Sequence, residues 1–186
     1  LPICTGFLTA AYPDLRVVHV VRDGRAVANS WLQMGWWDGW RGPENWFLGP
    51  LPDDLHRQWL ASGRSFPVLA ALGWRMLMAA FAEARAVHPP GQWLEVRYED
   101  LLAAPRDELA RILDFLGLPW TAAFERGLRR YRFHAERSAA YRRELSAAQL
   151  AQIEQVIAEP LRQWGYPLLG AHDEEAPPAA VPASGR

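Results

Sequence analysis

The residues between positions 22 and 30 have the types and spacing of an anion-binding site. Arg22, Asp23 and Arg25 form a polar turn, and Ser30 follows in a segment of helical character. A guanidinium is a forked donor that matches a phosphate, and a helix that starts after the turn adds free N–H groups and a positive dipole end. The Ser30 hydroxyl, about two helical turns further on, can donate to the same anion. The segment predicts a phosphate site; the alternative is a simple Arg22–Asp23 ion pair at a strand end.

Strands and helices must hold this turn in place. Residues 15–21 form a β-branched, nearly continuous apolar run, which predicts a strand buried on both faces of a parallel sheet. Residues 93–98 alternate as a second strand would. Helical patterns occupy residues 67–87, 105–117 and 145–165. Because strands alternate with helices, the predicted fold class is α/β, in which ligands bind beyond the carboxyl ends of the strands, where Arg22 lies.

The composition is that of a single globular domain. The chain has 186 residues, of which 50% are hydrophobic and 22% charged. A chain of this size buries roughly 70% of the surface that it exposes when unfolded. We expect residues 1–170 to form one domain and residues 171–186, rich in Asp, Glu, Ala and Pro, to form a disordered tail.

Net charge, cysteine content and hydropathy exclude several classes of partner. The net charge is −1, whereas nucleic-acid-binding domains are usually strongly basic, so no nucleic-acid partner is expected. The single cysteine, Cys4, cannot form an internal disulfide, which favours the cytoplasm as location. The longest apolar stretch, residues 67–82, is shorter than the ~20 residues of a membrane span and contains Arg75, so no membrane span is expected. No metal site is predicted.

Two segments taken together resemble a known enzyme family. Residues 13–30 read PDLRVVHVVRDGRAVANS, a strand followed by Arg-Asp-x-Arg-x-x-x-x-Ser. This resembles the 3′-phosphate-binding segment of the sulfotransferases that use 3′-phosphoadenylyl sulfate. Residues 97–101, RYEDL, with Pro105 and residues 113–119, LDFLGLP, resemble the second signature of the same family. The resemblance spans residues 1–166 and implies a parallel sheet flanked by helices, like that of the P-loop NTPases.

The resemblance implies roles for individual residues. Arg22 and Ser30 match the pair that holds the 3′-phosphate of the cofactor, and Tyr98 matches a residue near the adenine. Arg25 is a further candidate. Arg137 is the nearest match to a basic loop that reaches the same phosphate in the family; a solvated Arg-rich face is the alternative for it.

The implied activity is transfer of a sulfuryl group from 3′-phosphoadenylyl sulfate to a hydroxyl or amine of a small-molecule or glycan acceptor. The irregular segment 35–65 is expected to cover the acceptor site. Glu99 and Asp100 match family positions that shape the turn from strand to helix. His19 is predicted to be a core residue, and no catalytic base is assigned.

The N-terminal segment of the chain differs from that of the family. Family members begin with a strand and a loop rich in Gly, Ser and Thr, whose N–H groups cradle the 5′-phosphosulfate. Residues 1–7, LPICTGF, resemble the segment downstream of that loop, and all 20 basic residues are Arg, so no lysine replaces the usual one. A single donor to the developing charge contributes about 3–4 kcal/mol. We therefore expect that the N-terminal strand and phosphate loop are missing and that the isolated chain is inactive.

Two other interpretations stay open. The chain can be a non-catalytic nucleotide-binding or protein-interaction module on the same fold. Its partner surface would then consist of exposed Trp36, Trp37, Trp40 and Trp46, although Trp clusters more often form core or pocket walls. A nucleotide kinase would share the sheet topology, but it needs the phosphate loop, and the segment from Arg22 to Ser30 is not a kinase feature.

Overall fold

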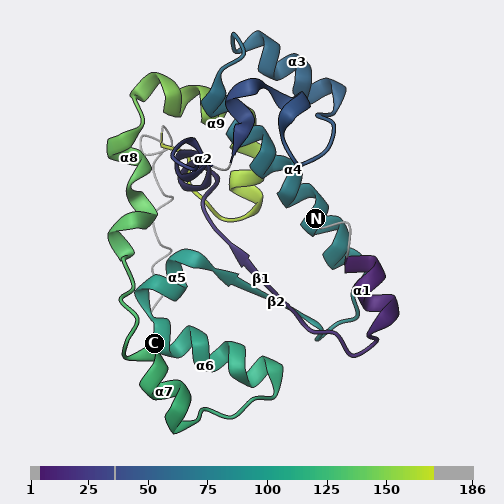
Figure 1. Cartoon of the computed structure of the whole chain (residues 1–186), viewed down its shortest axis with the longest axis vertical. Coiled ribbons are helices and arrows are strands. Elements are labelled where there is room, and N and C mark those ends of the chain that lie inside the picture. The colour runs from purple at the N-terminus through teal and green to yellow at the C-terminus, as the bar shows by residue number, and fades with distance from the viewer. Residues whose placement is uncertain (1–4, 36, 170–186) are drawn as a thin grey trace, which may run out of the picture.

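The computed structural model describes residues 5–35 and 37–169 (Figure 1). A short parallel sheet lies at the centre, with helices packed around it, so the predicted α/β class is confirmed. In chain order the elements are α1 (Thr5–Ala11), β1 (Val17–Val21), α2 (Gly24–Leu32), the 3-10 helices η2 (Asp38–Arg41) and η3 (Pro43–Asn45), α3 (Asp53–Ala61), α4 (Phe66–Val87), β2 (Trp93–Arg97), α5 (Tyr98–Ala103), α6 (Pro105–Leu116), α7 (Ala122–Leu128), the 3-10 helix η4 (Ala135–Ala139), α8 (Tyr141–Glu144) and α9 (Ala147–Gln163). The predictions for Cys4 and for residues 171–186 fall outside the described residues.

The sheet consists of β1 and β2 side by side and parallel. Val17 pairs with Trp93 and Val21 pairs with Arg97, so the two strands end at the same level. Both strands were predicted from their apolar patterns and are confirmed. Parallel strands need a long crossover connection, and here the chain crosses through α2, α3 and α4. The register makes the residues after each strand, 22 and 98, neighbours.

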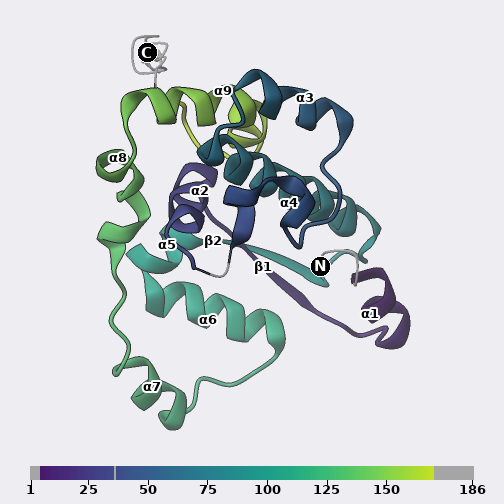
Figure 2. The ribbon, with the colours of Figure 1, turned by 45° about the horizontal axis from the view of Figure 1, so that its top comes forward.

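Helices α2, α4 and α9 form the main core at the carboxyl end of β1 (Figures 1 and 2). Asp23 caps α2, because its Oδ1 accepts a hydrogen bond from the Arg25 backbone N–H at 2.9 Å. At Gly24 a Cβ atom would lie 2.6 Å from the Trp74 ring, so only a glycine allows α2 to approach α4 this closely. The predicted capping box at the start of α9 is confirmed, with Ser146 and Gln149 bonding each other's backbone.

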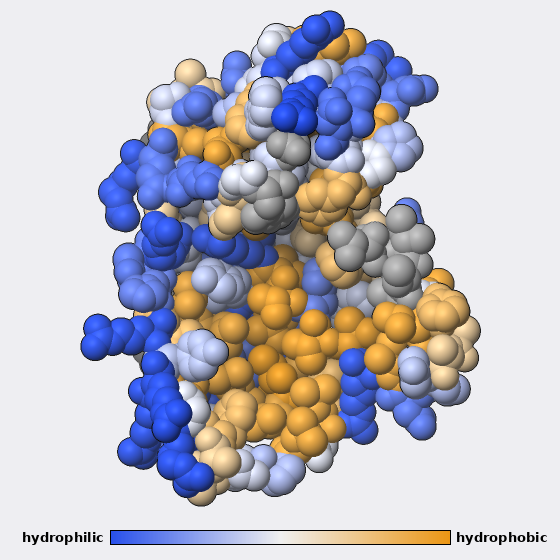
Figure 3. Space-filling view, viewed as in Figure 1, coloured by the Kyte–Doolittle hydropathy of each residue, from blue (hydrophilic) through white to orange (hydrophobic). Residues whose placement is uncertain are grey.

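The sheet is covered unevenly, which corrects one expectation. β1 was predicted to be buried on both faces, but Val20 is 47% exposed. On the other face His19 is 4% exposed and stacks on Phe81 of α4 at 4.2 Å between ring centroids. Helix α6, predicted from its apolar stripe, has no fully buried residue. A broad apolar area therefore remains on the surface where Figure 1 places β1 and α6 (Figure 3).

Among the described helices, α4 has the length and apolar composition that a membrane span requires, since it runs for 22 residues. The sequence had indicated a shorter apolar stretch at residues 67–82. Residues 67–74 of α4 are all buried inside the protein, where they pack on α2 and α9. α4 is therefore a core helix, as the sequence predicted.

Candidate functional site

The two strands deliver a pair of side chains to one edge of the sheet. Because Val21 and Arg97 are partners, Arg22 and Tyr98 leave the sheet side by side. The Arg22 guanidinium carbon lies 4.7 Å from the centroid of the Tyr98 ring, which is cation–π distance. This edge is the carboxyl end of the strands, where ligands of α/β sheets bind.

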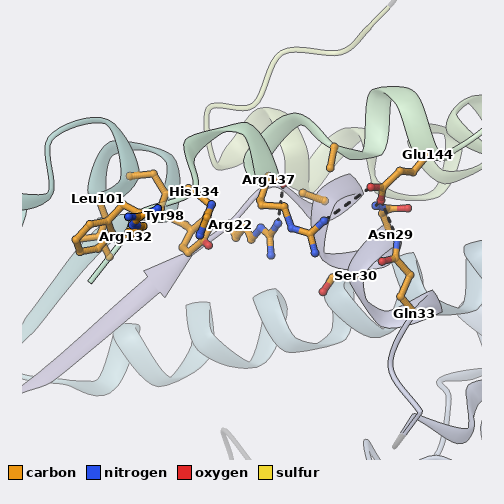
Figure 4. Close-up of a pocket in the computed structure, with 14 residues that line it drawn as sticks. Arg22, Asn29, Ser30, Gln33, Tyr98, Leu101, Arg132, His134, Arg137 and Glu144 are labelled. Atoms are coloured by element: carbon orange, nitrogen blue, oxygen red, sulfur yellow. Dashed lines mark hydrogen bonds and ion pairs between the residues drawn. The ribbon is translucent and has the colours of Figure 1, made fainter. Parts of the chain in front are cut away.

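A cavity of about 430 Å³ opens at this edge. It lies between α2, α5 and the segment that runs through η4 to α8 (Figure 4). The lining residues are Arg22, Ala26, Asn29, Ser30, Gln33, Tyr98, Leu101, Leu102, Arg132, Phe133, His134, Arg137, Ala140 and Glu144. Its Arg side chains give the cavity a local positive character in a chain whose net charge is −1.

Arg22 is half-buried and incompletely paired. Its Nη2 donates to the backbone carbonyl of Arg137 at 3.2 Å. Its Nε is buried and has no hydrogen-bond partner among the described residues. An unpaired buried donor costs about 1–3 kcal/mol, more when the group is charged. The Arg22 side chain lines the cavity, although its Nε is covered.

Helix geometry places Ser30 in the same cavity. Residues 26, 29, 30 and 33 lie at spacings of three and four residues, so they share one face of α2, and all of them line the cavity. Arg137 enters from the opposite wall, with a side chain that is 63% exposed. In Figure 4 Arg22, Ser30 and Arg137 are directed toward the same space. The structure thus brings together Arg22, Ser30, Tyr98 and Arg137, as the sequence predicted.

Arg25 is the one predicted site residue that does not line this cavity. It is 1% exposed, and its guanidinium contacts Asp23 at 2.6 Å and Glu154 of α9 at 2.5 Å. Burial alone would lower the pKa of Arg25, but the hydrogen bonds and charges of these carboxylates outweigh it and raise the pKa above its ordinary value. We therefore correct its role from cofactor binding to joining α2 and α9.

Glu99 is structural, as the sequence indicated. One of its carboxylate oxygens accepts from the Asp23 backbone N–H at 3.1 Å, and the other accepts from the Tyr166 hydroxyl at 2.9 Å. Burial and the Glu99 charge raise the pKa of Tyr166, so its hydroxyl stays a donor. Glu99 therefore fixes the Arg22–Asp23 turn on the end of β2 without entering the cavity.

Sequence reasoning missed several lining residues. Arg132 and His134 were not selected within the Arg-rich stretch, and Asn29 was passed over as a spacer inside the motif. No motif or pattern in the sequence indicated Glu144 as a site residue. Asn29 and Gln33 were accessible from the sequence, because they lie on the helix face that Ser30 defines.

The Trp-rich segment is divided between core and surface. Trp37 and Trp46 are 1% and 8% exposed, whereas Trp40 is 64% exposed. Trp36 falls outside the described residues. The continuous Trp surface on which the interaction-module hypothesis depended is therefore absent from the described part of this segment.

The fold and the cavity together define an α/β protein with an Arg-lined cavity at the carboxyl end of a parallel sheet. A sequence model described as the sulfotransferase family matches residues 4–122. The chain therefore belongs to the sulfotransferase family, a class of transferase enzymes.

Individual relatives agree with this assignment. Carbohydrate sulfotransferase 2 of Mus musculus and that of Homo sapiens are each 26% identical to the chain over 193 residues, which cover 87% of this chain and 36% of theirs. A solved sulfotransferase domain from the curacin biosynthetic pathway has the same fold, with a TM-score of 0.60, 14% identity, and coverage of 90% of this chain and 59% of that one. The chain thus spans about a third of the length of these curated relatives.

Proposed function

We propose that the cavity binds the 3′-phosphate of 3′-phosphoadenylyl sulfate, the donor of the sulfuryl group. The observation that carries this proposal is the Arg22 side chain, which has no carboxylate partner among the described residues and lines a cavity together with further Arg side chains. A phosphate has acceptor oxygens enough for several charge-assisted hydrogen bonds at once. The Arg side chains of the cavity therefore suit a phosphate both in their charge and in their position.

In this proposal each lining residue has a separate task. The neighbouring guanidinium groups of Arg22 and Arg137 bind the phosphate, and the Ser30 hydroxyl donates to it from α2. Tyr98 holds Arg22 in place through its ring and forms the wall on the adenine side. The donor, when bound, supplies an activated sulfuryl group on its 5′ end; the residues of this cavity bind and orient the nucleotide that leaves.

We further propose that the isolated chain binds the nucleotide without transferring the sulfuryl group. Residues 5–21 hold α1 and β1, and they include no Gly- and Ser-rich loop that could cradle a phosphosulfate. Transfer of this kind depends on stabilising charge at the leaving oxygen, and a preorganised donor there contributes about 3–4 kcal/mol.

A glycan is the acceptor that we propose. The relatives support it, since they are carbohydrate sulfotransferases. A second cavity of about 490 Å³ lies in the segment expected to cover the acceptor, lined in part by Glu44, Trp46 and His56. Aromatic, carboxylate and imidazole groups suit sugar hydroxyls and ring faces. Saturation-transfer NMR with a simple hexose such as glucose should show contact, and the double variant Glu44→Gln/His56→Ala should remove it. A signal that is unchanged in this variant would exclude the cavity.

The test of the phosphate site is a thermal shift. At 100-fold excess over Kd, 3′-phosphoadenosine 5′-phosphate should stabilise the chain by about 2.7 kcal/mol, which raises Tm by about 5–10 °C. Adenosine 5′-phosphate, which lacks the 3′-phosphate, should give little shift. Arg22→Ala should weaken binding by about 10- to 100-fold, because it removes charge-assisted hydrogen bonds.

Arg126→Ala is the matched control, since Arg126 is exposed and lies outside the cavity. It should leave the shift unchanged. Equal shifts with both nucleotides, or an Arg22→Ala variant that responds like the parent chain, would refute the proposal.

A further inference from the structure

The cavity contains a carboxylate, which is unexpected in a site that binds an anion. Among the described residues that line it, Glu144 is the one acidic side chain. Its Oε2 accepts hydrogen bonds from Asn29 Nδ2 at 2.6 Å and from Gln33 Nε2 at 2.8 Å. These donors belong to the same face of α2 as Ser30. The carboxylate is therefore built into the wall of the cavity and stands close to the proposed phosphate position.

Glu144 is ionised at neutral pH. Hydrogen bonds from Asn29 and Gln33, together with the charges of Arg137 and Arg143, hold the pKa of its carboxyl below the ordinary value. Asn29, which is 6% exposed, fixes the position of the carboxylate. A negative charge in this place repels an incoming phosphate.

The same carboxylate also faces Arg137. The distance from Arg137 Nη1 to Glu144 Oε1 is 4.0 Å, at the limit of an ion pair, and Arg137 is largely exposed. Its backbone is fixed separately, because its carbonyl accepts from Arg22. The Arg137 guanidinium can therefore change direction while the Arg137 backbone stays in place. Figure 4 shows this guanidinium between Glu144 and Ser30. A weak ion pair of this kind contributes little, so a phosphate can compete for the guanidinium.

We propose that Glu144 is an internal counter-ion that limits the affinity of the cavity for phosphate. It pairs weakly with Arg137 while the cavity is empty, and it repels the phosphate once the cavity is filled. The consequence is faster release of the bound bisphosphate nucleotide. The inference rests on the function proposed above and concerns the regulation of the same site.

A purely structural role predicts a different effect. If Glu144 served only to tie α8 to α2, removing its charge would leave binding unchanged or, where the wall loosens, would weaken it. Glu144→Gln separates the two roles, because the glutamine carbonyl can still accept from Asn29 and Gln33 while the negative charge is gone.

The experiment is calorimetric titration with 3′-phosphoadenosine 5′-phosphate at several salt concentrations. Glu144→Gln should bind about threefold to tenfold more tightly than the parent chain, and the difference should shrink at high salt. Glu159→Gln is the matched control: it removes the same charge from an exposed position on α9 outside the cavity, and it should change Kd less than about twofold. Titration with adenosine 5′-phosphate should show no gain in either variant.

The outcomes separate this inference from the proposed function. Equal or weaker binding by Glu144→Gln, with the parent chain binding normally, overturns the inference and leaves the phosphate site intact. An equal gain with adenosine 5′-phosphate also overturns it, because the effect would not concern the 3′-phosphate. If only Glu144→Gln binds, the inference is supported and the function proposed for the parent chain fails; if neither binds, both fail.

Discussion

Arg22 and Arg25 leave the same turn but enter opposite electrostatic environments. Arg25 is enclosed by the carboxylates of Asp23 and Glu154, and it also donates to the Pro167 carbonyl at 3.0 Å. Arg22 lies against an aromatic ring and a backbone carbonyl, and no described carboxylate is within ion-pair distance of it. The first region is a neutralised network in the core, and the second is a cavity in which Arg side chains outnumber the one carboxylate among its described lining residues, Glu144.

The contrast shows that the surroundings of an Arg side chain in the fold decide whether it stabilises the core or can bind a ligand. A buried charge must be paired within the protein, so Arg25 is committed to α9 before any ligand arrives. Arg22 is left without a carboxylate partner, so its charge can pair with a ligand anion in the cavity. Capacity for binding therefore depends on which guanidinium the fold leaves unpaired.

The largest effect that we expect in this comparison is on the stability of the core network. Arg25→Met should lower the free energy of unfolding by about 3–5 kcal/mol, because it leaves the buried Asp23 and the mostly buried Glu154 without their cation. Urea titration followed by circular dichroism measures this. Arg22→Met should cost less than about 1 kcal/mol in the same measurement. Similar losses for the two variants would mean that Arg22 also belongs to the structural network.

His19 is a third polar side chain of the same strand and turn, and it is buried without a hydrogen-bond partner among the described residues. Burial, and then the charge of Arg85, lower its pKa from 6.5 to about 4. Between pH 4 and pH 6.5, His19 is therefore mostly protonated in the unfolded chain and mostly neutral in the folded chain. Stability is complete above about pH 6.5 and should fall by about 2 kcal/mol from pH 7 to pH 5.

The comparison variant for His19 is His19→Leu, which keeps an apolar contact with Phe81 but cannot be protonated. Its unfolding free energy should stay nearly constant between pH 7 and pH 5. Glu95, which lies 4.0 Å from His19 Nδ1, is already paired with Arg85 at 2.8 Å and so does not stabilise a protonated His19. Parallel pH profiles for the two proteins would show that His19 does not titrate in this range.

The sequence predicted those features that depend on local pattern. The strands, α4, α6 and the capping box of α9 follow from periodicity and capping residues, and Arg22, Ser30 and Tyr98 follow from the family resemblance. Arg25 could not be placed, because its partner Glu154 is distant in sequence and belongs to α9. Glu144 was missed for the same reason: its meaning arises only where α8 packs beside α2 and presents the carboxylate to Asn29.

The smallest effect concerns the ring that supports Arg22. Tyr98→Leu removes the aromatic face 4.7 Å from the guanidinium carbon, and a contact of this kind contributes about 0.5–1 kcal/mol. We expect binding of 3′-phosphoadenosine 5′-phosphate to weaken by about twofold to fivefold, measured by calorimetry. Tyr98→Phe keeps the ring and should bind like the parent chain. Loss of binding in Tyr98→Phe would instead assign the function to the hydroxyl, as a direct donor to the nucleotide, and would make Tyr98 part of the cavity's polar surface rather than the support of Arg22.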